Sequence, residues 1–178
     1  MVYKSLKTSD IVSVSITIPK RLYDEATRRG IDVEDVIVVA LMSKLNLDPT
    51  LTADIRLELA GHYLNEGKSL IDKDPIQAGE KLYKAAEETV KALTIYYDLK
   101  DILARVDEKG IWTVTELEKS VIEISKRLSK WFRQSWDTAS YLHVWGFHEA
   151  KLDADDVKDR LPDIERIIQE ALRIINPS

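Results

Sequence analysis

The chain has 178 residues, 44% of them hydrophobic and 32% charged, and a formal net charge of −5. This length supports one well-packed core with at most a small appendage, and the acidic balance excludes a general affinity for polyanions. Cysteine is absent, which excludes disulfides and thiolate sites. Because neither an apolar leader nor a stretch of ~18 apolar residues occurs, we expect a cytoplasmic protein without membrane contact.

The first predicted element is a strand over residues 12–18. The stretch VSVSITI alternates apolar and small polar residues, which is the two-residue period of a half-buried strand. Two helices follow, KRLYDEATRRG closed by Gly30 and VEDVIVVALMSKL capped by Asp32. A single strand leaves its backbone hydrogen-bonding groups unpaired. We therefore expect it to pair with the same strand of a second chain, in a homodimer.

This order of elements resembles the ribbon-helix-helix module over residues 12–46. The resemblance implies strand pairing between two chains and DNA contact by outward strand side chains. Here the outward strand positions are serine and threonine, and the second helix opens with carboxylates that repel phosphate. We favour a dimerisation arm over residues 1–47. DNA binding, with Lys20 and Arg21 as candidate contacts, is the lesser alternative.

The remaining residues, 48–178, have helical patterns throughout. The predicted elements are a helix at 48–74, a second at 75–99, an apolar stripe from 117 to 146 that implies one long helix or two nearly coaxial ones, and a helix at 153–176 kinked or restarted at Pro162. No repeat of 20 to 50 residues occurs. The predicted fold is mainly α: an antiparallel helical bundle behind a strand-helix-helix arm.

Two of the three histidines, His143 and His148, lie five positions apart in SYLHVWGFHEA. Metal-binding pairs on a helix are spaced by three or four, because a five-residue step on an α-helix turns the two rings apart. We therefore expect no metal site and no cofactor, unless Gly146 ends the helix between them. The alternative to a functional role is packing, in which a neighbouring side chain satisfies a buried imidazole.

Aromatic and acidic residues supply the other candidate ligand contacts. The indoles of Trp136 and Trp145 suit core packing, an interface or the stacking of a base. Tyr83 and Glu87 lie with Glu80 on one rim of the apolar face of the helix at 75–99. Such carboxylates serve acid–base chemistry when a neighbour raises a pKa, or they solvate the bundle edge. The candidate ligand-binding residues are Trp136, Trp145, His148, Tyr83 and Glu87.

Two stretches, DPIQAGEKLYKAAEETVKAL and WDTASYLHVWGFHEAKL, resemble the archaeal PaREP family, whose helical domain is grouped with the HEPN superfamily. The resemblance covers residues 48–175 and implies an antiparallel bundle that dimerises. HEPN proteins include metal-independent ribonucleases, some of them toxins, and noncatalytic nucleotide-binding or scaffold domains. Catalytic members carry an arginine a few residues before a histidine. Here the candidate catalytic pair is Arg133 and His143, with nine residues between them.

The expected function is that of a noncatalytic, HEPN-like homodimeric binding module that holds a nucleotide or an RNA phosphate in the dimer groove, near Trp136, His143 and Trp145. One alternative is a metal-independent endoribonuclease of the toxin type that uses His143 and Arg133. A second is a DNA-binding autorepressor that acts through the N-terminal arm. A toxin–antitoxin partner protein would fit either alternative.

Overall fold

The computed structural model describes residues 12–177 of the chain; residues 1–11, which belong to the predicted arm, and residue 178 lie outside the described residues. In order, the elements are α1 (Lys20–Arg28), α2 (Val33–Leu45), α3 (Pro49–Leu70), α4 (Pro75–Tyr96), α5 (Lys100–Lys109), α6 (Val114–Leu128), α7 (Lys130–Tyr141), the π-helical turn η2 (Leu142–His148) and α8 (Ala154–Ile175). The prediction of a mainly α bundle is confirmed. None of the helices within residues 12–177 combines the length and apolar character needed to cross a bilayer.

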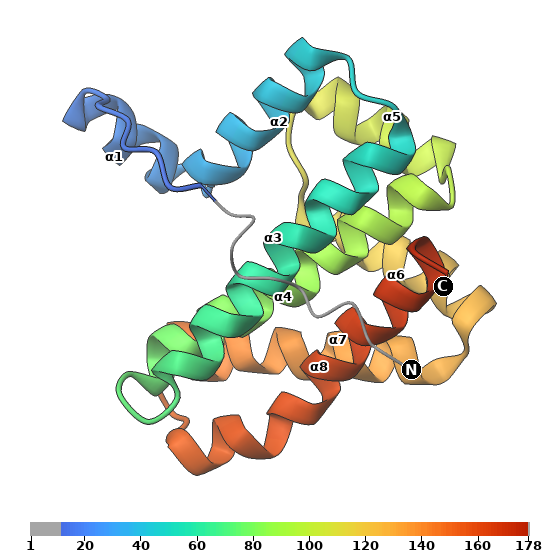
Figure 1. The fold of residues 1–178 in the computed structure, drawn as a ribbon. Coiled ribbons are helices and arrows are strands. Elements are labelled where there is room, and N and C mark those ends of the chain that lie inside the picture. Colours follow the sequence, from blue (N-terminus) through green and yellow to red (C-terminus); the bar gives the residue numbers. More distant parts are fainter. Residues whose placement is uncertain (1–11, 178) are drawn as a thin grey trace.

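Helix α4 is the central element of the bundle. It runs side by side with α3, to which a short turn joins it, and it also contacts α6, α7, α8 and η2. Figure 1 shows α7 lying across the direction of this pair, whereas α8 runs roughly parallel to it. Small and apolar side chains of α4 are fully buried, among them Ala78, Leu82, Ala85, Ala86, Val90 and Leu93. The small ones allow the neighbouring helices to approach α4 closely.

The long helices begin at side-chain caps that the sequence encodes. Asp48 and Asp74 each accept a hydrogen bond from the backbone three residues on, and Pro49 and Pro75 occupy the first helical positions. Proline is suited to this position because its missing N–H has no partner there in any helix. At α8, Asp153 forms a capping box with a carboxylate three residues later. These caps explain why the predicted starts of α3, α4 and α8 agree with the structure.

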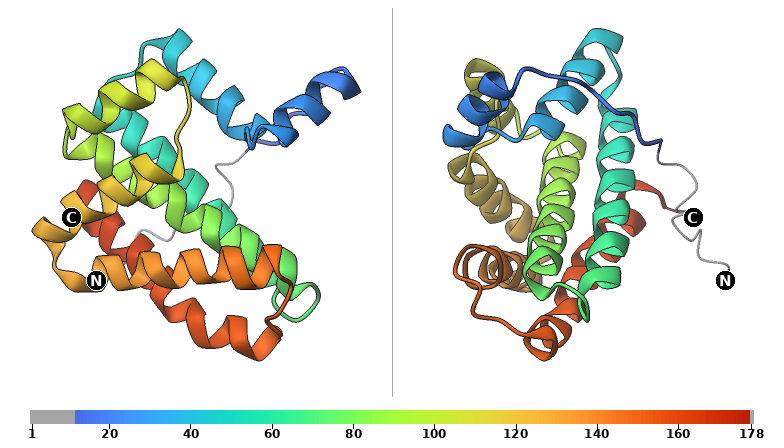
Figure 2. Two further views of the ribbon diagram at one scale, coloured as in Figure 1. Left: turned by 180° about the vertical axis from the view of Figure 1, so that it is seen from behind. Right: turned by 90° about the vertical axis from the view of Figure 1, so that its left-hand side faces the viewer.

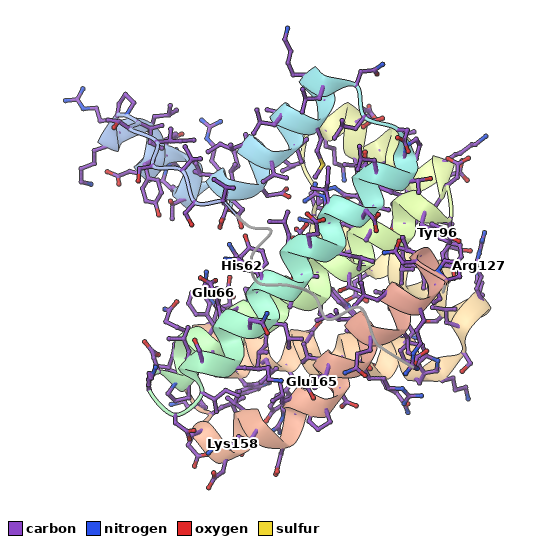
Figure 3. All side chains as sticks on the ribbon, viewed as in Figure 1. His62, Glu66, Tyr96, Arg127, Lys158 and Glu165 are labelled. Carbon is purple, nitrogen blue, oxygen red and sulfur yellow. The ribbon has the colours of Figure 1, made fainter. Side chains whose placement is uncertain are left out.

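The apolar stripe from 117 to 146 is divided among three elements. Ser129 separates α6 from α7 and has a φ of 73°, in the left-handed region, so the chain turns there. The last part of the stripe is not α-helical but forms η2. Pro162, by contrast, lies inside α8 without ending it. Glu165 of α8, which Figure 3 labels, forms an ion pair with Lys68 of α3 at 2.5 Å.

The predicted N-terminal strand is wrong. Residues 12–19 form no strand, and no strand occurs elsewhere among residues 12–177. A strand is stabilised by a ladder of backbone hydrogen bonds, and all regular structure in the described chain is helical, so the alternating pattern has no ladder to join. Val12, Val14 and Ile16 are exposed instead. Helix α1 has no buried residue and projects from the bundle (Figures 1 and 2). The domain boundary at residue 47 remains a prediction.

Candidate functional site

The π-helical turn η2 brings the two histidines together. In a π-helix each N–H bonds to the carbonyl five residues earlier, as Glu149 N does to Val144 O at 2.9 Å. Residues five apart therefore lie one above the other, and the Nε2 atoms of His143 and His148 are 3.0 Å apart. The sequence-based inference that the five-residue step separates the rings is wrong, because it assumed α-helical geometry. We call His143 and His148 the histidine pair.

Two glycines hold η2 close against α4. A Cβ atom added to Gly79 would lie 3.1 Å from the carbonyl oxygen of Leu142 and 3.7 Å from the Cα of Gly146. Gly146 lies inside η2 and does not have the positive φ of a helix-terminating glycine. Its role is therefore close approach and not the ending of a helix. This contact places Glu80, the residue after Gly79, beside the histidine pair.

Glu80 orients the inner histidine. Its Oε2 lies 2.6 Å from Nδ1 of His143, and the two side chains are 17% and 27% exposed. A carboxylate accepts, so Nδ1 of His143 donates and its Nε2 is left to face His148. His148 is exposed. The arrangement is a chain of three polar groups that runs from a half-buried carboxylate to an imidazole at the surface.

The ring of Tyr83 fixes the orientation of His143 from the other side. The two rings stack with centroids 4.1 Å apart and an interplanar angle of 24°. Burial raises the pKa of Tyr83, and the carboxylate of Glu87, to which its hydroxyl is hydrogen-bonded, raises it further, so the phenol stays neutral. Next to it, Trp136 is only 1% exposed and donates from Nε1 to Glu118 Oε1 at 2.7 Å. This indole offers no ring face to a ligand.

The remaining predicted site residues lie elsewhere. Each residue of a helix is rotated by about a quarter turn from the residue before it. Trp145, two residues after His143, therefore points to the opposite flank of η2. There it is 46% exposed and lies near Tyr141, with ring centroids 6.2 Å apart. Arg133 is exposed on α7, about 15 Å along the helix axis from His143 at 1.5 Å per residue. Of the proposed catalytic pair, only His143 lies at the site.

Lys20 and Arg21, the weak candidates for nucleic-acid contact, begin α1 and are exposed. Lys20 forms an ion pair with Asp24 at 2.5 Å, one helical turn away. This pairing reduces the positive charge that α1 presents to a phosphate. The two residues are far along the chain from the histidine pair and lie on α1, which projects from the bundle.

A second polar cluster lies further along α4, and sequence reasoning missed it. Its positive members are Arg56 and Lys91, 2% and 1% exposed. Arg56 contacts Asp35 and Glu88 at 2.7 Å each, and Lys91 contacts Glu87, Glu88 and Asp35 at 2.7, 2.9 and 3.1 Å. We call these five residues the buried ion cluster. The adjoining cavity has a volume of only about 10 Å³, so the cluster joins α2 to α3 and α4 and leaves no room for a ligand.

The buried ion cluster shifts the pKa values of its carboxyl groups in opposite directions. Burial disfavours ionised Asp35, but the charges of Lys91 and Arg56 outweigh it, so the pKa of Asp35 is lowered. For Glu87 burial is the stronger effect, despite the attraction of Lys91, and its pKa is raised. Asp35 therefore stays ionised, which keeps the charges of Arg56 and Lys91 compensated inside the protein.

The model of the archaeal PaREP1/PaREP8 family matches residues 55–168, a span that contains both polar clusters except Asp35. The chain belongs to this family. Two solved structures resemble it. The crystal structure of a protein from Sulfolobus solfataricus has 36% sequence identity and a TM-score of 0.60, and the match covers 64% of this chain and 93% of that one. The solution structure of the Orf c02003 protein has 34% identity and a TM-score of 0.59, and the match covers 66% of this chain and 92% of that one. No curated protein matches the chain. The PaREP1/PaREP8 match covers Glu80, Tyr83 and the histidine pair but neither α1 nor α2.

Proposed function

We propose that this PaREP1/PaREP8 protein is a noncatalytic, HEPN-like binding module that holds a nucleotide or RNA phosphate at the histidine pair. The observation that carries the proposal is the chain of contacts from Glu80 through His143 to the exposed His148. With Nδ1 of His143 donating to Glu80, Nε2 of His143 accepts from Nε2–H of His148. The ring nitrogen that His148 keeps for an anionic ligand is Nδ1, which carries an N–H when this imidazole is protonated.

The proposal is noncatalytic because Arg133, the arginine of the predicted catalytic pair, does not lie at His143. Arg133, the nearest upstream arginine, is about 15 Å away along the helix. The side chain closest to His143 in the polar chain is the carboxylate of Glu80, which repels phosphate. One exposed imidazole can contribute to binding, whereas charge stabilisation during phosphodiester cleavage requires further cationic donors.

The experiment measures binding and cleavage together. Fluorescence anisotropy with a labelled single-stranded RNA, in EDTA, would compare the wild-type protein with His148→Ala and with His62→Ala as the matched control. His62 lies on α3, with Glu66 one turn further on (Figure 3). We expect His148→Ala to weaken binding at least about tenfold, a loss of about 1.4 kcal/mol, and His62→Ala to leave it unchanged. Equal binding by all three proteins would refute the proposal.

The alternative is a metal-independent endoribonuclease, and the same contacts give it specific support. A carboxylate that orients one imidazole toward a second polar group is the arrangement found in general acid–base catalysis. Gel analysis of the RNA from the binding samples separates the two functions. Intact RNA supports a binding module, whereas cleavage in EDTA that is lost in His143→Ala, and kept in His62→Ala, would establish the nuclease instead.

A further inference from the structure

The two Nε2 atoms of the histidine pair lie 3.0 Å apart, and the two rings are closer together than a straight hydrogen bond would place them. A straight N–H···N bond between imidazoles would place the ring centres about 5 Å apart or more. The observed centroid distance is 4.4 Å, with the rings at 77° to each other and the nitrogens 3.0 Å apart. At least one ring is therefore turned away from the line that joins the two nitrogens, and a distance near 4.4 Å is also expected when both nitrogens bind one atom between them.

These distances fit a metal ion. Imidazole nitrogens bind divalent transition metals at about 2.0–2.1 Å, so two of them at a right angle around one ion lie about 3 Å apart. A tetrahedral angle would separate them by about 3.4 Å. The observed 3.0 Å is close to the right-angled arrangement, which octahedral and square-planar ions adopt. We propose that His143 and His148 form a two-histidine site for a divalent transition-metal ion, with Ni²⁺ and Cu²⁺ as the best-fitting ions.

The surroundings of His143 supply what a metal-binding imidazole needs behind it. A metal-bound histidine commonly donates its other ring N–H to a carboxylate, which fixes the tautomer and makes the ligand nitrogen more basic. Glu80 Oε2, 2.6 Å from Nδ1 of His143, has this position. The stacked ring of Tyr83, 4.1 Å away, restricts rotation of the same imidazole. One ligand is therefore preorganised, and the exposed His148 closes onto the ion from the same turn.

The protein supplies two ligands to this ion, and water completes the coordination. Among residues 12–177 no group of three or more His, Cys, Asp or Glu side chains is arranged around one point, so the site is open and differs from a closed structural zinc site. Open positions on the ion are free to accept an oxygen ligand such as a phosphate. Metal binding goes beyond the proposed function and does not rest on it, because the two imidazoles bind the ion in the absence of any nucleotide.

The test is a calorimetric titration of Ni²⁺ into the untagged protein, without RNA. We expect one ion per chain for the wild type, at least about tenfold weaker binding in Glu80→Gln, and loss of the site in His143→Ala and in His148→Ala. His62→Ala is the matched control and should bind as the wild type does. Absence of binding by the wild type, or unchanged binding in His148→Ala, would overturn the inference.

A spectroscopic readout excludes loss of the fold as the reason for lost binding. The electron paramagnetic resonance spectrum of Cu²⁺ should show coupling to two imidazole nitrogens in the wild type and no such coupling in His148→Ala, whose circular dichroism should be unchanged because His148 is exposed. Identical coupling in both proteins would contradict the site. The RNA experiment in EDTA is independent of this result. Ion binding without RNA binding would refute the proposed function alone, and RNA binding without ion binding would refute the metal site alone.

Discussion

Two polar clusters lie along α4, and they differ in how completely their groups are paired. The buried ion cluster places Arg56 and Lys91, each almost fully buried, among three carboxylates from α2 and α4. The histidine pair lies near the start of the same helix, where Glu80 is 17% exposed and His148 is at the surface. Both clusters contain acidic residues of α4, but only the second ends in a side chain that is exposed.

The difference separates a structural role from a binding role. A charge buried among opposite charges is compensated within the protein, and removal of one partner leaves another charge buried and unpaired. A chain of groups that ends at an exposed imidazole keeps one donor or acceptor for a ligand. We therefore expect substitutions in the buried ion cluster to change stability, and substitutions in the histidine pair to change binding.

The largest expected effect is that of Arg56→Ala. Removing this side chain leaves the carboxylates of Asp35 and Glu88 short of a partner in the interior, which should lower the free energy of unfolding by about 3–5 kcal/mol. Urea denaturation followed by circular dichroism measures the change. The control is Lys68→Ala, which breaks the more exposed pair with Glu165 and should cost no more than about 1 kcal/mol. Similar losses for both variants would contradict a structural role for the cluster.

Asp35→Asn should have the next largest effect, and its size should depend on pH. Hydrogen bonds to charged partners contribute about 1.5–3 kcal/mol, and Asp35 makes them with Arg56 and Lys91. Its pKa in the folded protein is lowered from the ordinary 3.8, so its contribution is complete above that pH and is lost as the pH falls below it. Urea titrations at pH 7 and at successively lower pH should show the difference between the two proteins shrinking below about 3.8. A constant difference would show that Asp35 acts without its charge.

Gly79→Ala tests how η2 is held against α4. The added methyl group would lie 3.1 Å from the carbonyl oxygen of Leu142, so η2 must shift, at a cost of about 1–2 kcal/mol in the free energy of unfolding. Gly146→Ala is the comparison, because its Cβ first meets a side-chain carbon of Leu152 at 3.4 Å and should be tolerated better. The shift of η2 should also weaken binding at the histidine pair. A Gly79→Ala protein with wild-type stability would show that the contact between Gly79 and Leu142 is not tight.

The smallest effect on stability should come from His148→Ala. The side chain is exposed, and substitutions at such positions usually change the free energy of unfolding by no more than about 0.5 kcal/mol. Thermal unfolding should give nearly equal midpoints for the variant and the wild type, although RNA binding is expected to weaken and the Ni²⁺ site to be lost. A loss of stability as large as that of Arg56→Ala would mean that the histidine pair is structural as well, and the contrast between the two clusters would fail.

The residues of the two clusters were not equally visible in the sequence. His143, His148, Tyr83 and Glu87 stand out as polar or aromatic residues near an apolar stripe, and three of them lie at or beside the site. Arg56 and Lys91 carry no such signal, because a charged residue in a helical pattern is normally exposed. Their burial depends on partners 21 to 56 positions away, and a single sequence does not reveal such distant pairs.

The local sequence determined the helices of the bundle. Asp–Pro pairs at residues 48–49 and 74–75 fix two helix starts, and apolar periodicity identifies the buried face of α4, because caps and periodicity act within a few residues. Tertiary structure decided the rest. Whether an alternating segment becomes a strand depends on a hydrogen-bonding partner outside the segment. Whether two histidines five positions apart meet depends on a π-helical turn. Here that turn lies against α4 at the contact of Gly79 and Gly146. This contact joins residues 67 positions apart in the chain.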